Sequence, residues 1–166
     1  MATITFKGSP IHTAGTLPAK GAGAPAFKLV AGDLSEATLE KFAGKKKILN
    51  IVPSLDTGVC QMSARKFNTA VGDLKNVVLI NISADLPFAQ KRFCESEKLT
   101  HITNLSVFRS PDFGRAYGVT ISDGPLTGLL SRAVLVLDEN NKVLHAEQVP
   151  EIAQEPDYDA ALEAVK

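Results

Sequence analysis

The residues of this chain best suited to covalent chemistry are its two cysteines, Cys60 and Cys94. A cysteine thiolate attacks peroxide oxygens and disulfides, and two thiols of one chain can form and break a disulfide. In a reducing cytosol, a pair of cysteines is more often catalytic or simply buried than a permanent structural bridge. The surroundings of each cysteine therefore decide between a chemical role and a packing role.

Cys60 lies where the chain should pass from a buried strand into a helix. If Thr57 is the N-cap of that helix, Cys60 is its third residue, close to backbone N–H groups that have no partner within the helix. These groups and the positive end of the helix dipole favour the thiolate form of a cysteine. The simpler alternative is that Cys60 packs on the apolar face of the helix, which is the better explanation for an isolated cysteine.

The neighbours of Cys60 change this balance. Taken singly, Thr57 is explained as an N-cap and Pro53 as the terminator of a strand. Together, Pro53, Thr57 and Cys60 form the pattern P-x-x-x-T-x-x-C, which resembles the peroxide-attacking loop of peroxiredoxins. The spacing is fairly specific, so this segment is interpreted as a reactive thiol site.

A second segment carries a more specific resemblance. Residues 83–94, with the sequence Ser-Ala-Asp-Leu-Pro-Phe-Ala-Gln-Lys-Arg-Phe-Cys, resemble without departure the signature of bacterial thiol peroxidases, an atypical two-cysteine subfamily of the peroxiredoxins. The resemblance includes residues 108–115 and 129–132 and covers essentially the whole chain. Accidental similarity over such a length is improbable.

The resemblance implies roles for particular residues. Cys60 is the peroxidatic cysteine and Cys94 the resolving cysteine of the same chain, while Pro53, Thr57 and Arg132 form the pocket. In this interpretation Thr57 hydrogen-bonds the reacting oxygen, Arg132 stabilises charge on the thiolate and the peroxide, and Pro53 shields the sulfur from water. Without the resemblance, Arg132 would be interpreted as a strand arginine paired with a carboxylate.

The same resemblance implies an activity and its partners. It implies a peroxidase that reduces hydrogen peroxide and organic hydroperoxides through a Cys60 sulfenic acid and an intramolecular Cys60–Cys94 disulfide. Thioredoxin would be the external reductant, no prosthetic group would be needed, and the protein would be a homodimer. A rival hypothesis assigns the same cysteines to a non-enzymatic redox sensor or chaperone, whose disulfide changes the surface presented to a partner.

Composition and the N-terminal residues argue against several other classes of protein. Eighteen Lys and Arg residues balance eighteen Asp and Glu residues, so no net field favours nucleic acid or an anionic membrane. No apolar run approaches the roughly eighteen residues that cross a bilayer, and the first residues lack the features of a secretory signal. We therefore expect a cytoplasmic protein with no nucleic-acid or membrane partner.

Metal chemistry and dithiol-reductase chemistry are also disfavoured. The histidines His12, His101 and His145 are scattered, with no H-x-x-x-H motif and no Cys/His pair at the spacing of metal ligands. We therefore expect no metal. The absence of a C-x-x-C motif weighs against a thioredoxin-like dithiol reductase.

The elements that must position the two cysteines follow from hydrophobic periodicity. Apolar, β-branched runs at 47–52 and 77–82, each followed by a helical pattern, predict parallel strands covered on both faces. The first helix should present one apolar stripe, formed by Cys60, Ala64, Phe67, Val71 and Leu74. The second helix is expected over 88–98, with Cys94 late in it. Residues 131–137 and 142–149 predict an antiparallel hairpin, so the sheet should be mixed, and 156–165 predicts a closing helix.

The N-terminal part adds a further feature. Residues 1–13 predict a β-hairpin, and residues 14–25, rich in Gly, Ala and Pro, predict an extended connection. Residues 27–30 predict a short strand, and Leu39 and Phe42 mark one face of a short helix that ends at Gly44. A chain of this length fits one domain that folds without disulfides or metal. With the resemblance, we expect an α/β fold over residues 1–166: a thioredoxin-like three-layer sandwich with a mixed central sheet and an N-terminal β-hairpin extension.

Overall fold

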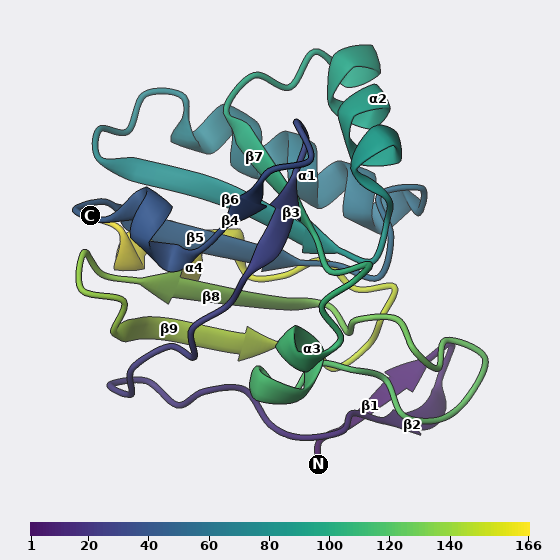
Figure 1. Ribbon diagram of the computed structural model, residues 1–166. Coiled ribbons are helices and arrows are strands. Elements are labelled where there is room, and N and C mark those ends of the chain that lie inside the picture. The colour runs from purple at the N-terminus through teal and green to yellow at the C-terminus, as the bar shows by residue number, and fades with distance from the viewer.

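A computed structural model describes all residues from Met1 to Lys166 and divides the strands between two sheets (Figure 1). The strands are β1 Thr3–Phe6, β2 Ser9–His12, β3 Leu29–Ala31, β4 Glu36–Ala37, β5 Lys46–Ile51, β6 Val77–Ser83, β7 Ile102–Ser106, β8 Ala133–Leu137 and β9 Val143–Gln148. The helices are α1 Gly58–Val71, α2 Pro87–Glu97, α3 Asp112–Ala116 and α4 Tyr158–Ala164, with a 3₁₀ helix, η1, at Leu39–Phe42. None of these helices is both long and apolar enough to span a membrane.

The central sheet has seven strands in the order β4-β3-β7-β6-β5-β8-β9. Strands β5, β6 and β7 run parallel to one another, and the other neighbours are antiparallel. The predicted mixed sheet and the predicted antiparallel hairpin of β8 and β9 are confirmed. Because β5 and β6 end at the same edge, the loops leading into α1 and α2 lie together there, where open α/β sheets usually carry their sites.

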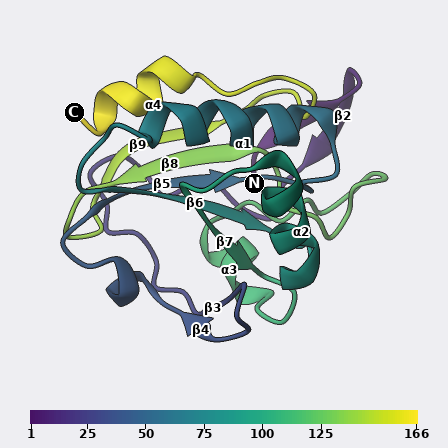
Figure 2. The same cartoon turned by 90° about the horizontal axis from the view of Figure 1, so that it is seen from above.

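Helices and connecting segments cover both faces of this sheet (Figures 1 and 2). Helices α1 and α4 lie along one face, with α2 beside α1 at the end of the sheet (Figure 2). The apolar cluster under α1 and α4 comprises Ile48, Phe67, Val71, Leu79, Val134, Val136, Ala161 and Val165. The opposite face carries α3, whose Phe113 ring stacks on Tyr117 with the centroids 4.4 Å apart. Three layers result.

The predicted N-terminal hairpin is confirmed. Strands β1 and β2 pair antiparallel, with Ile4 opposite Ile11. Both isoleucines are buried against Ile121 and Ile152, so the small sheet is attached to the rest of the chain by an apolar contact. Residues 14–25, which follow, form no helix or strand, as the composition predicts.

The apolar stripe of the first helix is confirmed with one change. The residues of the stripe from Cys60 to Val71 are buried on α1, whereas Leu74 lies beyond the end of the helix and packs beside the same cluster. The helix also buries two polar side chains, those of Ser63 and Asn68. Periodicity alone did not predict these, because an apolar pattern contains no information about polar partners across the sheet.

Three elements were missing from the sequence prediction: β4, β7 and α3. Strand β7 contains Thr103 and Asn104, which interrupt the apolar run that marks a buried strand, and only Leu105 and Ser106 at its end are fully buried. Strand β4 has two residues and α3 has five, so each is too short to show a period. The short helix expected near Leu39 is present as η1.

Candidate active site

Cys60 is the third residue of α1, just after the loop that leaves β5. Thr57 is the N-cap and has an extended backbone, as predicted, but its hydroxyl donates to the carbonyl of Ser54 at 3.1 Å instead of capping the helix. The first backbone bond of the helix runs from the N–H of Gln61 to the carbonyl of Thr57 at 3.0 Å. The N–H groups of the helical residues before Gln61 therefore point toward the helix start, where they favour an anion.

Arg132 brings a buried positive charge to the sulfur of Cys60. It directly precedes β8, and the pairing of Ala133 with Ile51 places the start of β8 beside the end of β5. The guanidinium Nη1 lies 3.2 Å from Cys60 Sγ, and Nε donates to the carbonyl of Ile152 at 2.8 Å. Arg132 is 1% exposed and Cys60 is 0% exposed, so solvent does not screen their contact.

The Arg132 side chain has two hydrogen-bond partners. They are a backbone carbonyl and a sulfur, not the carboxylate expected of an ordinary strand arginine. A buried guanidinium needs a nearby negative charge, because desolvation makes an unpaired buried charge costly. A negative charge on the Cys60 sulfur would meet that need at the contact distance observed.

The loop that carries Pro53 and Thr57 is fixed by hydrogen bonds to a residue just after the end of the neighbouring strand, β6. Asp85, which follows β6, accepts hydrogen bonds from the N–H of Leu55 at 2.7 Å and from the hydroxyl of Ser54 at 2.8 Å. Pro53 is buried at the start of this loop. The role of Asp85 was missed in the sequence, where the residue was noted only as part of a signature. The available signal was its position directly after a buried parallel strand next to the strand that leads to Cys60.

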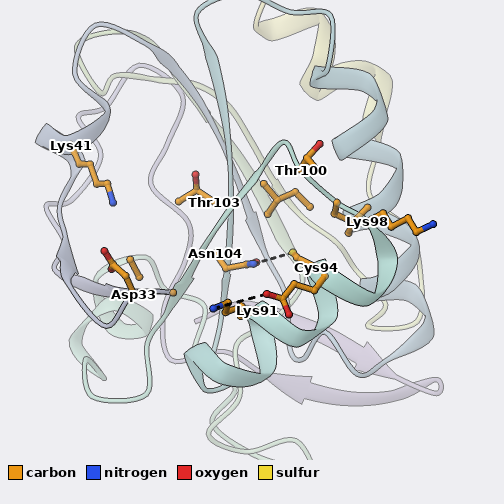
Figure 3. Close-up of a pocket in the computed structure, with 13 residues that line it drawn as sticks. Asp33, Lys41, Lys91, Cys94, Lys98, Thr100, Thr103 and Asn104 are labelled. Atoms are coloured by element: carbon orange, nitrogen blue, oxygen red, sulfur yellow. Dashed lines mark hydrogen bonds and ion pairs between the residues drawn. The ribbon is translucent and has the colours of Figure 1, made fainter.

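Cys94 lies late in α2, as predicted, and its side chain is half-buried. Its Sγ accepts a hydrogen bond from Asn104 Nδ2 on β7 at 3.0 Å (Figure 3). Burial raises the pKa of the Cys94 thiol, and the hydrogen bond from Asn104 partly offsets this rise. Cys94 also lines a cavity of about 660 Å³ between α2, β7 and the β3–β4 connection (Figure 3). Sequence reasoning missed Asn104, because no local pattern marks it.

The structure thus brings together four of the predicted site residues and leaves the fifth apart. Pro53, Thr57 and Cys60 share one loop and the first turn of α1, and Arg132 contacts the sulfur. Both cysteines are free thiols, and none of these four residues lines the cavity beside Cys94. Helices α1 and α2 still share one apolar cluster, formed by Val52, Leu55, Cys60, Ala64 and Phe93 with Cys94 at its margin.

No histidine side chain is hydrogen-bonded to Cys60, Cys94 or Arg132. His12 Nδ1 lies 2.6 Å from a carboxylate oxygen of Asp123 at the surface, and the backbone N–H of His101 donates to Asn68. No group of three or more His, Cys, Asp or Glu side chains is placed to hold a metal ion.

Known proteins are similar in sequence to nearly the whole of this chain. Residues 19–162 match the family described as Redoxin. The chain is 50% identical over 165 residues to the thiol peroxidase of Mycobacterium bovis (strain ATCC BAA-935 / AF2122/97), and the aligned region covers 99% of each chain.

Solved structures agree with the sequence relatives. The fold superposes on a peroxiredoxin-like protein from Aquifex aeolicus with a TM-score of 0.91 at 39% identity, covering 99% of this chain and 96% of that one. It superposes on a thiol peroxidase from Chromobacterium violaceum with a TM-score of 0.91 at 28% identity, covering 97% and 93%. The expected thioredoxin-like sandwich is confirmed by these similarities.

Proposed function

Because the chain belongs to the Redoxin family, among its bacterial thiol peroxidases, we propose that it reduces hydrogen peroxide and organic hydroperoxides with the thiolate of Cys60. The observation that carries this proposal is the contact of Arg132 Nη1 with Cys60 Sγ at 3.2 Å in a site closed to solvent. A buried cation against a sulfur stabilises the thiolate, which is the nucleophilic form.

In the first step, the Cys60 thiolate attacks one peroxide oxygen and the O–O bond breaks. The sulfur becomes a sulfenic acid, and the second oxygen takes up a proton and leaves as water or an alcohol. Negative charge passes from the sulfur to the leaving oxygen, so Arg132 and the N–H groups at the start of α1 stabilise the transition state. In this proposal the Thr57 hydroxyl turns from the Ser54 carbonyl to donate to the reacting oxygen, and Pro53 keeps water from the sulfur.

Peroxide must first reach a sulfur that is closed to solvent. Cys60 is 0% exposed, whereas the residues just before it, Asp56, Thr57 and Gly58, are exposed. These residues form the junction between the loop and α1, and backbone at a helix end opens at low free-energy cost. We assign the entry of peroxide to a local movement of this junction.

In the second step, the Cys94 thiol attacks the Cys60 sulfenic acid, forming the disulfide and releasing water. In the structure the two sulfurs are free and have different partners: Cys60 Sγ contacts Arg132, and Cys94 Sγ accepts from Asn104. A disulfide requires Cα atoms within about 7 Å. We propose that the first turn of α1 and the segment 88–98 open locally in this step to let the sulfurs meet, while the sheet persists.

A dithiol reductant completes the cycle. By the resemblance this reductant is thioredoxin, which attacks the Cys60–Cys94 disulfide and returns both cysteines to thiols while becoming oxidised itself. The cycle requires no prosthetic group. Because the disulfide must be reduced after each turnover, we place the enzyme in the reducing cytoplasm.

The proposal includes a homodimer that packs near the active site. Three large apolar side chains are exposed close to the sheet edge where the Cys60 loop lies: Leu86 (51%), Phe88 (68%) and Phe108 (45%). They follow β6 and β7, which run parallel and end in register. Exposed aromatic and aliphatic side chains on one edge suit a protein interface. Sedimentation of the unmodified protein and of a Phe88→Ser variant tests this: dimer for the first, a shift toward monomer for the second.

Steady-state turnover separates an enzyme from a redox sensor. With thioredoxin, thioredoxin reductase and NADPH, we expect continuous NADPH consumption that depends on peroxide and disappears in Cys60→Ser. A sensor built on the same cysteines would consume roughly one peroxide per chain and stop, because it has no efficient return to the thiol state. A single stoichiometric burst with no further turnover would contradict the proposed function.

A further inference from the structure

Three asparagines lie side by side on the central strands beneath the helices that carry the cysteines. Asn50 on β5 pairs in register with Asn81 on β6, which pairs in register with Asn104 on β7. Residues in register on neighbouring strands share one face of a sheet. Asn50 and Asn81 are 0% exposed. Buried amides are costly unless they are hydrogen-bonded, so this row needs a reason.

One end of the row contacts the helix of the peroxidatic cysteine. Asn50 Nδ2 donates to Asn81 Oδ1 at 3.0 Å and lies 3.4 Å from the hydroxyl oxygen of Ser63. That hydroxyl donates to the carbonyl of Cys60 at 3.0 Å. The buried polar side chain of Ser63 on α1 is thereby explained.

The other end of the row contacts Cys94. Asn104 Nδ2 donates to Cys94 Sγ at 3.0 Å (Figure 3). It also approaches the carbonyl of Gln90, on α2, at 3.5 Å. Between the two ends, Asn81 Nδ2 is a buried donor and Asn104 Oδ1 a buried acceptor, neither with a partner of its own. These two groups are complementary and belong to residues in register, so a contact between them would complete the row.

We propose that Asn104 is a positioning residue for Cys94 and that its hydrogen bond sets the rate of disulfide formation. This inference rests on the proposed resolving role of Cys94. In the reduced protein the amide holds the sulfur on the sheet, beside the cavity and away from Arg132. To reach Cys60, the sulfur must leave Asn104, whose half-buried amide then loses its 3.0 Å bond and keeps at most the longer contact with the Gln90 carbonyl. The bond therefore stabilises the reduced arrangement and opposes the opening of α2.

The same bond has a second effect with the opposite sign. It offsets part of the rise that burial causes in the pKa of Cys94, which favours the thiolate. However, the sulfur gives up this bond before it reaches Cys60, so the stabilisation acts on the starting state and is absent from the transition state. An interaction present only in the starting state raises the barrier.

Removal of the donor tests the inference. Asn104→Leu has a side chain of nearly the same size with no donor, and Asn104→Ala removes the donor with a different shape. Reduced protein is mixed rapidly with one equivalent of hydrogen peroxide, and formation of the sulfenic acid and of the disulfide are followed as separate phases. We expect the disulfide phase to be about five- to tenfold faster in both variants, from the net value of one hydrogen bond, and the sulfenic acid phase to be unchanged.

The thiol–disulfide equilibrium of the Cys60–Cys94 pair provides a second measurement, which separates loss of the Asn104 bond from a general loosening of the fold. In a dithiol redox buffer, the disulfide of both variants should be favoured by a similar five- to tenfold factor. For this two-electron couple the factor corresponds to a reduction potential about 20–30 mV more negative.

A matched control separates the contact with sulfur from loss of any buried amide. Asn68 on α1 is 9% exposed, and its Oδ1 accepts from the N–H of His101, which links α1 to the segment entering β7 without touching a cysteine. Asn68→Leu should leave both the disulfide rate and the potential unchanged.

Three results would overturn the inference. They are an unchanged or slower disulfide phase in both Asn104 variants, an unchanged potential, or an equal acceleration in Asn68→Leu. Failure of the unmodified protein to form a Cys60–Cys94 disulfide would be a different result. It would contradict the resolving role of Cys94 itself, and the inference with it.

Discussion

Replacing Arg132 with methionine removes the charge that contacts Cys60 while keeping an unbranched side chain in a buried position. A hydrogen bond to a charged group contributes about 1.5–3 kcal/mol, and about 1.4 kcal/mol changes a rate tenfold. If the bond is lost from the transition state, Arg132→Met should lower the second-order rate constant for hydrogen peroxide about 10- to 150-fold. Because the contact between Arg132 and Cys60 is closed to solvent, added salt should not lower the rate constant of the unmodified protein by a similar factor.

The assay follows peroxide consumption in a single turnover by stopped-flow mixing, with the thiolate absorbance of the reduced protein measured at neutral pH. In the Cys94→Ser background, Cys60 is the one cysteine that can contribute to the thiolate absorbance. We expect this absorbance to fall when Arg132→Met is added. The variant also removes the donor to the carbonyl of Ile152, so its unfolding free energy should fall by about 1–3 kcal/mol. Urea unfolding measures that effect separately.

Arg65→Met is the matched control. Arg65 lies on α1, the helix that carries Cys60, but its side chain is partly exposed. It pairs with Glu97 through two hydrogen bonds of 2.9 Å and is hydrogen-bonded to neither sulfur. Its loss should leave the peroxide rate within about twofold, because exposed ion pairs contribute little. A rate in Arg132→Met equal to that of the unmodified protein, with the same thiolate absorbance, would refute the assignment of Arg132.

Two further outcomes follow from the same contacts. Because burial raises the pKa of Cys94, alkylation of Cys94 by iodoacetamide in Cys60→Ser should be slow at neutral pH and should reach its plateau above the pH at which a free cysteine does. A plateau at or below that pH would contradict this, and Asn104→Leu should move it still higher. Asp85→Asn weakens the bonds that fix the Cys60 loop, so we expect urea unfolding to show a loss of about 1–3 kcal/mol and hydrogen exchange to rise at Leu55. Asp33→Asn, at an exposed turn, is its control and should change neither quantity.

The parts of the fold that local patterns determine were predicted from the sequence. Strands β5 and β6 are rich in aliphatic and β-branched residues because both of their faces are covered, and each contains a single asparagine, Asn50 or Asn81. Helix α1 shows its buried stripe because one side packs on the sheet. Strand β7 was missed because Thr103 and Asn104 stand together in a strand of only five residues and leave too short an apolar run to mark it. The Asn104 side chain contacts Cys94 on α2, and a local sequence pattern carries no signal for a partner on another element.

The site residues also divide into those that local sequence patterns predict and those that depend on the pairing of distant strands. The position of Cys60 at a helix start follows from Thr57 and the strand before it, which are local signals. Arg132 lies 72 residues further along the chain, and only the antiparallel pairing of β8 with β5 brings it to the sulfur. Before the structure, its role came from resemblance alone. The contacts of Asp85 and Asn104 depend on the register of three strands, which no local pattern encodes.

Mass analysis after one equivalent of hydrogen peroxide tests the central claim most directly. In the unmodified protein, we predict one intramolecular disulfide joining Cys60 to Cys94. Cys94→Ser should stop at a sulfenic acid on Cys60, trapped by a sulfenic-acid reagent, and Cys60→Ser should remain reduced at Cys94. A Cys60→Ser protein that still consumes the peroxide, or an unmodified protein that forms no such disulfide, would contradict the account.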